Sequence, residues 1–99
     1  MARLTAHAKD LLDGDLMHAS ENGYTPDVKS LLAKGADVHV ADDYALRHAS
    51  RWGHTAVVKL LIEAGADIHA EEDSALREAV KNGRTEVVKL LTDWKEVNK

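Results

Sequence analysis

The sequence predicts an all-α solenoid, in which short helix-turn-helix units stack side by side within one domain. Two observations support this fold class. The chain repeats with a fixed period of thirty residues, because residues 15–40 match residues 45–70 at thirteen of 26 positions. Each copy also contains two apolar stripes with helical spacing, bounded by helix-capping residues. Helices of two turns are unstable alone in water, so each unit must cover the apolar face of its neighbour.

Composition limits the classes of function. The chain has 99 residues, of which 44% are hydrophobic and 30% charged, and these values favour one folded domain. Its net charge of −4 disfavours a general nucleic-acid binder, and no apolar run approaches the roughly 18 residues of a membrane helix. No cysteine is present, and the N-terminus lacks the apolar core of a secretory signal. We therefore expect a cytoplasmic protein that binds no nucleic acid, membrane or cofactor.

The chain divides into an N-terminal segment and three repeats. Residues 1–14 are compatible with an N-terminal capping helix, because Leu4, Ala8, Leu11 and Leu12 fall on one stripe. Repeat 1 is expected at residues 15–40, repeat 2 at 41–70, and repeat 3 with a polar C-terminal cap at 71–99.

The first helix of each unit is predicted at residues 44–52 and again at 74–82. Asp43, or Asp73 with Ser74, can cap its start by accepting a free backbone N–H. A glycine follows each helix, at positions 53 and 83, where the left-handed conformation of a helix C-cap is needed.

The second helix is predicted at residues 55–64, with Thr55 as its N-cap. In the first copy Thr25 takes this place, and Pro26 occupies the first helical position, where a missing N–H costs nothing. Glycines at positions 35 and 65 are expected to end these helices.

The stretch "GHTAVVKLLIEAGADIHA", residues 53–70, resembles the ankyrin repeat, and the resemblance covers roughly residues 15–94. The first copy also resembles the N-terminal capping repeat of designed ankyrin proteins. The resemblance implies stacked helix-turn-helix repeats that bind another protein on their concave face. The period of thirty is shorter than the usual 33 or so, which predicts clipped hairpin loops. At family-typical positions, Tyr44 and Ser74 replace Thr, Arg47 and Arg77 replace His, and His39 and His69 replace Asn.

Histidines and arginines recur at repeat spacing. His39 and His69 are expected to bond loop backbone as a ladder, with a shared zinc site as the alternative. His54, in the Gly-His pair, is assigned a structural role. Arg47 and Arg77 are expected to reach carboxylates of adjacent loops.

No arrangement of residues suggests catalysis. There is no Ser/His/Asp or Cys/His grouping that would activate a nucleophile, and the glycines lie at helix ends instead of in a phosphate-binding loop. We expect that the protein is not an enzyme.

Positions that vary between copies are those that packing leaves free, and they mark the candidate partner site. Trp52 is the sharpest feature, because it follows Arg51 and has Asn at the equivalent position in both other copies. Trp and Arg are typical of interface hot spots, although packing over a neighbouring helix is the alternative. Trp94 is expected to cover the last repeat. The variable tails of the first helices are Glu21-Asn22, Arg51-Trp52 and Lys81-Asn82. The resemblance implies that these tails lie on the concave surface, and that the candidate partner-binding residues there also include His18, His48, Glu78, Asp42, Asp43 and Tyr44.

The predicted function is a monomeric, non-enzymatic module that binds another protein. Two alternatives stay open at this point: a designed or consensus-like scaffold without an evolved partner, and a homo-oligomer.

Overall fold

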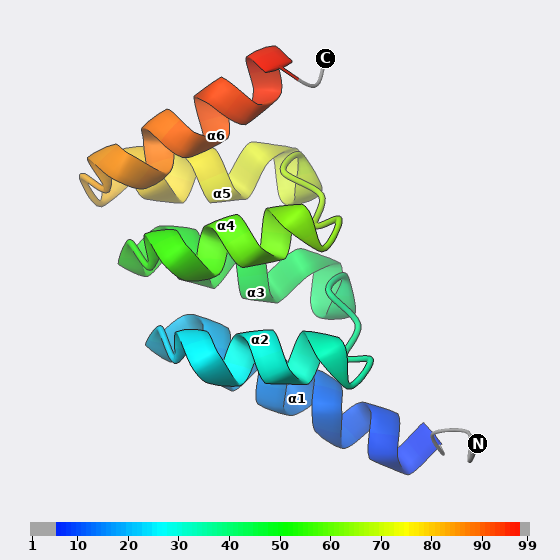
Figure 1. Cartoon of the computed structure of the whole chain (residues 1–99). Helices are drawn as coiled ribbons and strands as arrows, with labels where there is room; N and C mark the ends of the chain where they lie inside the picture. Colours follow the sequence, from blue (N-terminus) through cyan, green and yellow to red (C-terminus); the bar gives the residue numbers. More distant parts are fainter. Residues whose placement is uncertain (1–5, 98–99) are drawn as a thin grey trace.

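The helices form two layers that stack in chain order. The computed structural model describes residues 6–97, and the side chains of residues 8–94. Figure 1 shows α1, α3 and α5 stacked as one layer and α2, α4 and α6 as the other. No strand occurs between residues 6 and 97, so the predicted all-α solenoid is confirmed. The elements are α1 (Ala6–Asn22), α2 (Thr25–Ala33), α3 (Val40–Trp52), α4 (Thr55–Glu63), α5 (Ala70–Lys81) and α6 (Thr85–Val97).

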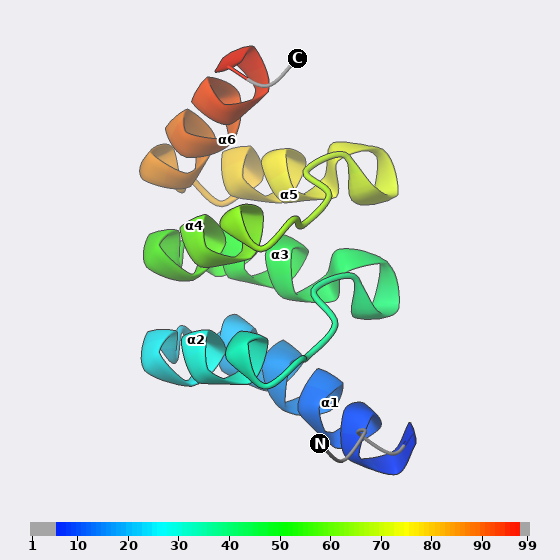
Figure 2. The ribbon, with the colours of Figure 1, turned by 45° about the vertical axis from the view of Figure 1, so that its right-hand side comes forward.

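Connectors of two kinds lie at opposite edges of the stack. Within each pair a short turn joins the two helices, and Gly53 ends α3 with a left-handed φ of 77°. Between pairs a longer connector returns the chain to the first layer, and Figure 2 shows both of these on one edge. We call the edge with the longer connectors the turn edge. The first-layer helices therefore begin at the turn edge and end at the opposite edge.

Helix α1 is longer than the sequence predicted. The helix expected within residues 1–14 and the first helix of repeat 1 form one continuous helix, which passes through Gly14 without a break. Leu4, which was expected on its apolar stripe, lies outside the described residues. The carboxylate of Asp13 accepts a hydrogen bond of 2.7 Å from the backbone N–H of Asp37. This bond ties α1 to the connector that follows α2.

The predicted N-caps are wrong in detail. The N-cap positions of α2 and α4 are Tyr24 and His54, and neither side chain makes a capping hydrogen bond. The hydroxyls of Thr25 and Thr55 instead point toward carbonyls two residues earlier, at 3.5 Å. Asp43 does not serve as a simple cap either, because it is the last residue of a left-handed turn.

The core lies between the layers and repeats with the sequence. Apolar positions that recur in the copies are removed from water, which is the main favourable contribution to folding. Trp94 packs against this core, as expected for a residue that covers the last repeat. The largest fully buried apolar side chains are Leu16, Leu46, Leu61, Val28, Val57, Val58 and Val87.

The N-terminal face of the stack is polar where internal repeats are apolar. Asp15 and Asp27 are exposed, whereas the residues one period later, Ala45 and Val57, are fully buried against the preceding repeat. A carboxylate at such a position stays hydrated only if no repeat covers it. The presence of exposed aspartates where later repeats have buried apolar residues supports a capping role for the N-terminal helix pair. Within the described residues, no helix has the length and apolar character needed to cross a membrane.

Candidate functional site

The most exposed large aromatic side chain of the predicted site is that of Trp52, which lies at the end of α3. Its exposed fraction is 45%, so the indole is not covered by a neighbouring helix. The guanidinium carbon of Arg51 lies 5.2 Å from the centre of the indole ring, within the range of a cation–π contact. Arg51 also approaches Glu78 of the next repeat, with 3.8 Å between Nε and Oε2. The arginine therefore connects Trp52 to α5.

A shallow hollow separates the end of α1 from the end of α3. Its volume is about 590 Å³, and it combines an indole, imidazoles, a carboxylate and an amide. Most of these groups are polar, and the Trp52 indole is the large apolar one among them. The hollow is lined by His18, Glu21, Asn22, Trp52 and His54.

Tyr44 and His48 of α3 form a stacked pair that leans on Glu21. Their ring centres are 3.8 Å apart, and the tyrosine hydroxyl donates a 3.0 Å hydrogen bond to Glu21. His48 Nδ1 lies 3.5 Å from the other carboxylate oxygen. Burial lowers the pKa of His48, while Glu21 opposes that shift. Burial and the bond to Glu21 both raise the pKa of Tyr44.

His48 is only partly exposed. Just 21% of its side chain is accessible, because Tyr44 covers one face of the ring. His18 is exposed, and its ring meets Tyr24 edge to face at 6.1 Å. The histidines at equivalent repeat positions thus differ in surroundings.

The end of α5 presents the third row of predicted residues. Glu78 is half-buried, whereas Lys81 and Asn82 are exposed. The Asn82 amide donates a 2.8 Å hydrogen bond to the Glu78 carbonyl, as the Asn22 amide does to that of His18. Both asparagines thus bond to a carbonyl in the last turn of their own helix, and the Glu78 carbonyl also accepts a 3.0 Å bond from the backbone N–H of Asn82.

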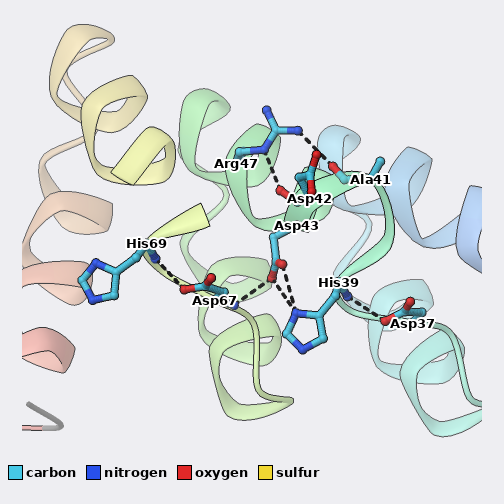
Figure 3. A network of polar contacts seen from close by, with 8 residues as sticks. All are labelled: Asp37, His39, Ala41, Asp42, Asp43, Arg47, Asp67 and His69. Atoms are coloured by element: carbon cyan, nitrogen blue, oxygen red, sulfur yellow. Dashed lines mark hydrogen bonds and ion pairs between the residues drawn. The ribbon is translucent and has the colours of Figure 1, made fainter. Parts of the chain in front are cut away.

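Asp42 and Asp43 lie at the other end of α3, away from Trp52. Asp42 is exposed, but Asp43 is only 4% exposed. The Asp43 carboxylate accepts a 2.7 Å bond from the backbone N–H of Asp67 and contacts Nδ1 of His39 at 3.0 Å (Figure 3). Because these bonds hold the carboxylate in the fold, it offers little surface to a partner. The assignment of Asp43 to the partner site is therefore corrected.

The histidine ladder exists in a different form from the predicted one. The rings of His39 and His69 bond to carboxylates, those of Asp43 and Asp73, instead of to loop backbone. The hydrogen bond to Asp43 is the main cause of a raised pKa at His39. Among the described residues, no three His, Cys, Asp or Glu side chains converge as a metal-binding group.

The predicted carboxylate partners of the repeated arginines are also wrong. Arg47 and Arg77 donate to backbone carbonyls within the left-handed turns at the beginning of α3 and α5. Figure 3 shows the guanidinium of Arg47 directed at Ala41 and Asp42. The sequence could indicate that these arginines recur, but not that carbonyl oxygens would face them.

Arg84 is a structural residue that sequence reasoning missed. His54 Nε2 donates a 2.9 Å hydrogen bond to the Glu21 carbonyl, and Arg84, one period later, donates a 3.1 Å bond to the Arg51 carbonyl. Both side chains thus reach back to the first helix of the preceding repeat. Position 84 is equivalent to position 54 in the repeat, and this equivalence could have indicated a shared role. The change from His54 to Arg84 concealed it. The structural role assigned to His54 agrees with this contact.

The chain matches a known family over most of its length. A family model described as ankyrin repeats, in three copies, matches residues 16–99. No curated protein sequence matches the chain. The matched range contains both layers of the stack and every residue of the candidate site.

Proposed function

This chain belongs to the ankyrin repeat family, and from that membership we propose that it binds another protein through the exposed ends of α1, α3 and α5. Ankyrin repeats are generally protein–protein interaction modules, and the family is generally non-enzymatic. We further propose that the module is a cytoplasmic monomer without a cofactor and that the concave face of the repeat stack holds the partner.

The observation that supports this site best is the exposure of Trp52. An indole that is 45% exposed leaves apolar surface in water, and this surface is open to burial by a partner. The adjoining hollow of about 590 Å³ can receive a partner side chain next to the ring. The remaining first-layer residues, from Asn22 to Asn82, would form the polar rim of such an interface.

Three kinds of partner-facing chemistry meet on this surface. Arg51 and Lys81 supply positive charge, and the Trp52 indole supplies apolar area and one N–H donor. Glu21 and Glu78 already have neighbours in the fold, through Tyr44 and Arg51 respectively. The groups least committed at these helix ends are therefore Trp52 and Lys81, which we propose contribute most to affinity.

An affinity capture from cell lysate tests the proposal. The bait is the full chain, beside a Trp52→Ala, Arg51→Ala double variant and a matched Lys59→Ala variant on the exposed face of α4. Captured proteins are identified by mass spectrometry, purified, and titrated against all three baits by calorimetry. A protein bound by the native and Lys59→Ala chains, and at least ~10-fold more weakly by the double variant, supports the proposal.

Two results would contradict it. Equal binding by all three folded baits would place the interface elsewhere. Empty capture from a monodisperse chain would favour the scaffold without an evolved partner.

A further inference from the structure

Two three-residue turns at the turn edge have a left-handed backbone. Ala41, Asp42 and Asp43 have φ values of 53°, 54° and 58°. Glu71, Glu72 and Asp73, one period later, have values of 54°, 55° and 62°. Every one of these residues carries a Cβ, which in this conformation crowds the following carbonyl oxygen. A run of three such residues is therefore unfavourable unless contacts outside the run stabilise it.

An arginine further along the same helix makes those contacts. Arg47 Nε donates to the Asp42 carbonyl at 2.9 Å, and its Nη2 donates to the Ala41 carbonyl at 3.1 Å (Figure 3). Arg77 repeats the pair on Glu72 and Glu71, at 2.9 and 3.0 Å. A planar guanidinium can hold two oxygens at once, which a lysine ammonium on a flexible stem does less well.

The first repeat offers an internal comparison. Its residue at the position of Arg47 is Met17, and methionine cannot donate a hydrogen bond. The corresponding residues 11–13 are right-handed there and belong to the continuous helix α1. In the described part of the chain, the left-handed turn thus accompanies arginine in two copies and is absent where methionine stands.

The turn also places functional side chains. Its last residue is Asp43, whose carboxylate joins the connectors on either side through His39 and Asp67. The next residue is Tyr44, and the Arg47 guanidinium carbon lies 6.0 Å from the centre of its ring. A change in the turn would therefore move both the ladder and the stacked aromatic pair.

We propose that Arg47 and Arg77 are positioning residues that clamp the two left-handed turns, and that the Arg47 clamp orients Asp42 and Tyr44. The clamp itself is independent of partner binding; its importance for recognition rests on the proposed function. The second clamp precedes Ser74, so it holds a turn without an aromatic neighbour and serves as the matched control.

Amide hydrogen exchange, followed by NMR on the full chain, tests the clamps without any partner. The Asp43 N–H bonds to the His39 carbonyl at 3.2 Å, and the Asp73 N–H bonds to that of His69 at 3.1 Å. The variants are Arg47→Met and Arg77→Met, which introduce the residue of the first repeat. Each should accelerate exchange about tenfold at the amide of its own turn and leave the other turn unchanged, because a hydrogen bond to a charged donor is lost.

The His48 ring signals report on Tyr44. Stacking at 3.8 Å shifts the imidazole protons of the native chain by the ring current of Tyr44. Arg47→Met should reduce this shift, and Arg77→Met should leave it intact. A purely global loss of stability would not separate the two variants in this way.

A second variant keeps the test decisive if Arg47→Met destabilises the whole chain. Adding Ala41→Gly removes a Cβ at positive φ, so exchange protection at Asp43 should return. Any of three results would overturn the proposal. Exchange could stay unchanged in both single variants, each single variant could accelerate exchange equally at both turns, or Ala41→Gly could fail to restore protection at Asp43. A chain without any partner would overturn the proposed function but leave the exchange result standing.

Discussion

The substitution Gly23→Ala tests how strongly the back-reaching side chains hold successive repeats together. Gly23 has a φ of +74°, and a Cβ added to it would lie 2.6 Å from Nδ1 of His54. That distance is too short, so the His54 ring would have to move and its 2.9 Å bond to the Glu21 carbonyl would be strained or lost. The substitution therefore combines backbone strain with the loss of a contact between repeats.

Gly83→Ala is the matched control, because it has the strain without the collision. Gly83 has a φ of +69°, and a Cβ added there would meet no atom of another segment within 4 Å. A left-handed alanine costs roughly 1–2 kcal/mol, which is the whole expected effect at this position. Displacing His54 adds about 1 kcal/mol for the hydrogen bond and a comparable amount for lost packing. We therefore expect Gly23→Ala to lower the free energy of unfolding by about 3–4 kcal/mol.

Urea unfolding followed by circular dichroism measures both variants. The excess loss in Gly23→Ala should disappear when His54→Ala is also present, because the collision then has no partner. If Gly23→Ala costs no more than Gly83→Ala, the reasoning is refuted, since His54 would then leave its place without penalty.

The remaining predictions concern the core, the candidate site and pH. Leu61 is fully buried, so Leu61→Ala should lower the free energy of unfolding by about 2–5 kcal/mol in urea titration; a negligible loss would contradict the stacked core. Trp52→Ala should change it by less than about 1 kcal/mol, because nearly half of the residue is in water and its contact with Arg51 is at an exposed site; a large drop in Tm would mean that the indole belongs to the core. The Asp43 carboxylate raises the pKa of His39, so the protonated ring stabilises the fold. This contribution is complete below the unfolded pKa of about 6.5 and is lost as the pH rises through the higher folded pKa. This change in the free energy of unfolding should stay under about 1 kcal/mol, because the His39 ring is 55% exposed. If the stability of His39→Gln has the same pH dependence as that of the native chain, His39 is not its origin.

The helices and the core could be predicted from the sequence because they depend on local spacing. Leu46 and Leu61 fall on apolar stripes of helical period, and both are fully buried. Gly53 follows its helix at the point where a left-handed residue is needed, and it has that conformation. The fixed period of thirty then required that identical faces cover one another, whatever the details of the connectors.

The candidate site was predictable only as a set of positions. Variation between copies identified Trp52 as a residue that packing does not require, and its exposure agrees with this. The family resemblance also suggested Asp43, which is buried because it bonds to a backbone N–H 24 residues away. A family resemblance does not show whether a carboxylate is free or joins two connectors.

The tertiary structure alone decided the connectors and the contacts between repeats. The turn Ala41–Asp43 contains no glycine, so no local signal predicts its left-handed backbone, which exists beside the Arg47 guanidinium. The bond from Arg84 to the Arg51 carbonyl spans 33 residues. Local periodicity determines which faces are apolar and where helices begin and end. The partner of each remaining polar group depends on which segments the stack brings within hydrogen-bonding distance, and this is a property of the folded chain as a whole.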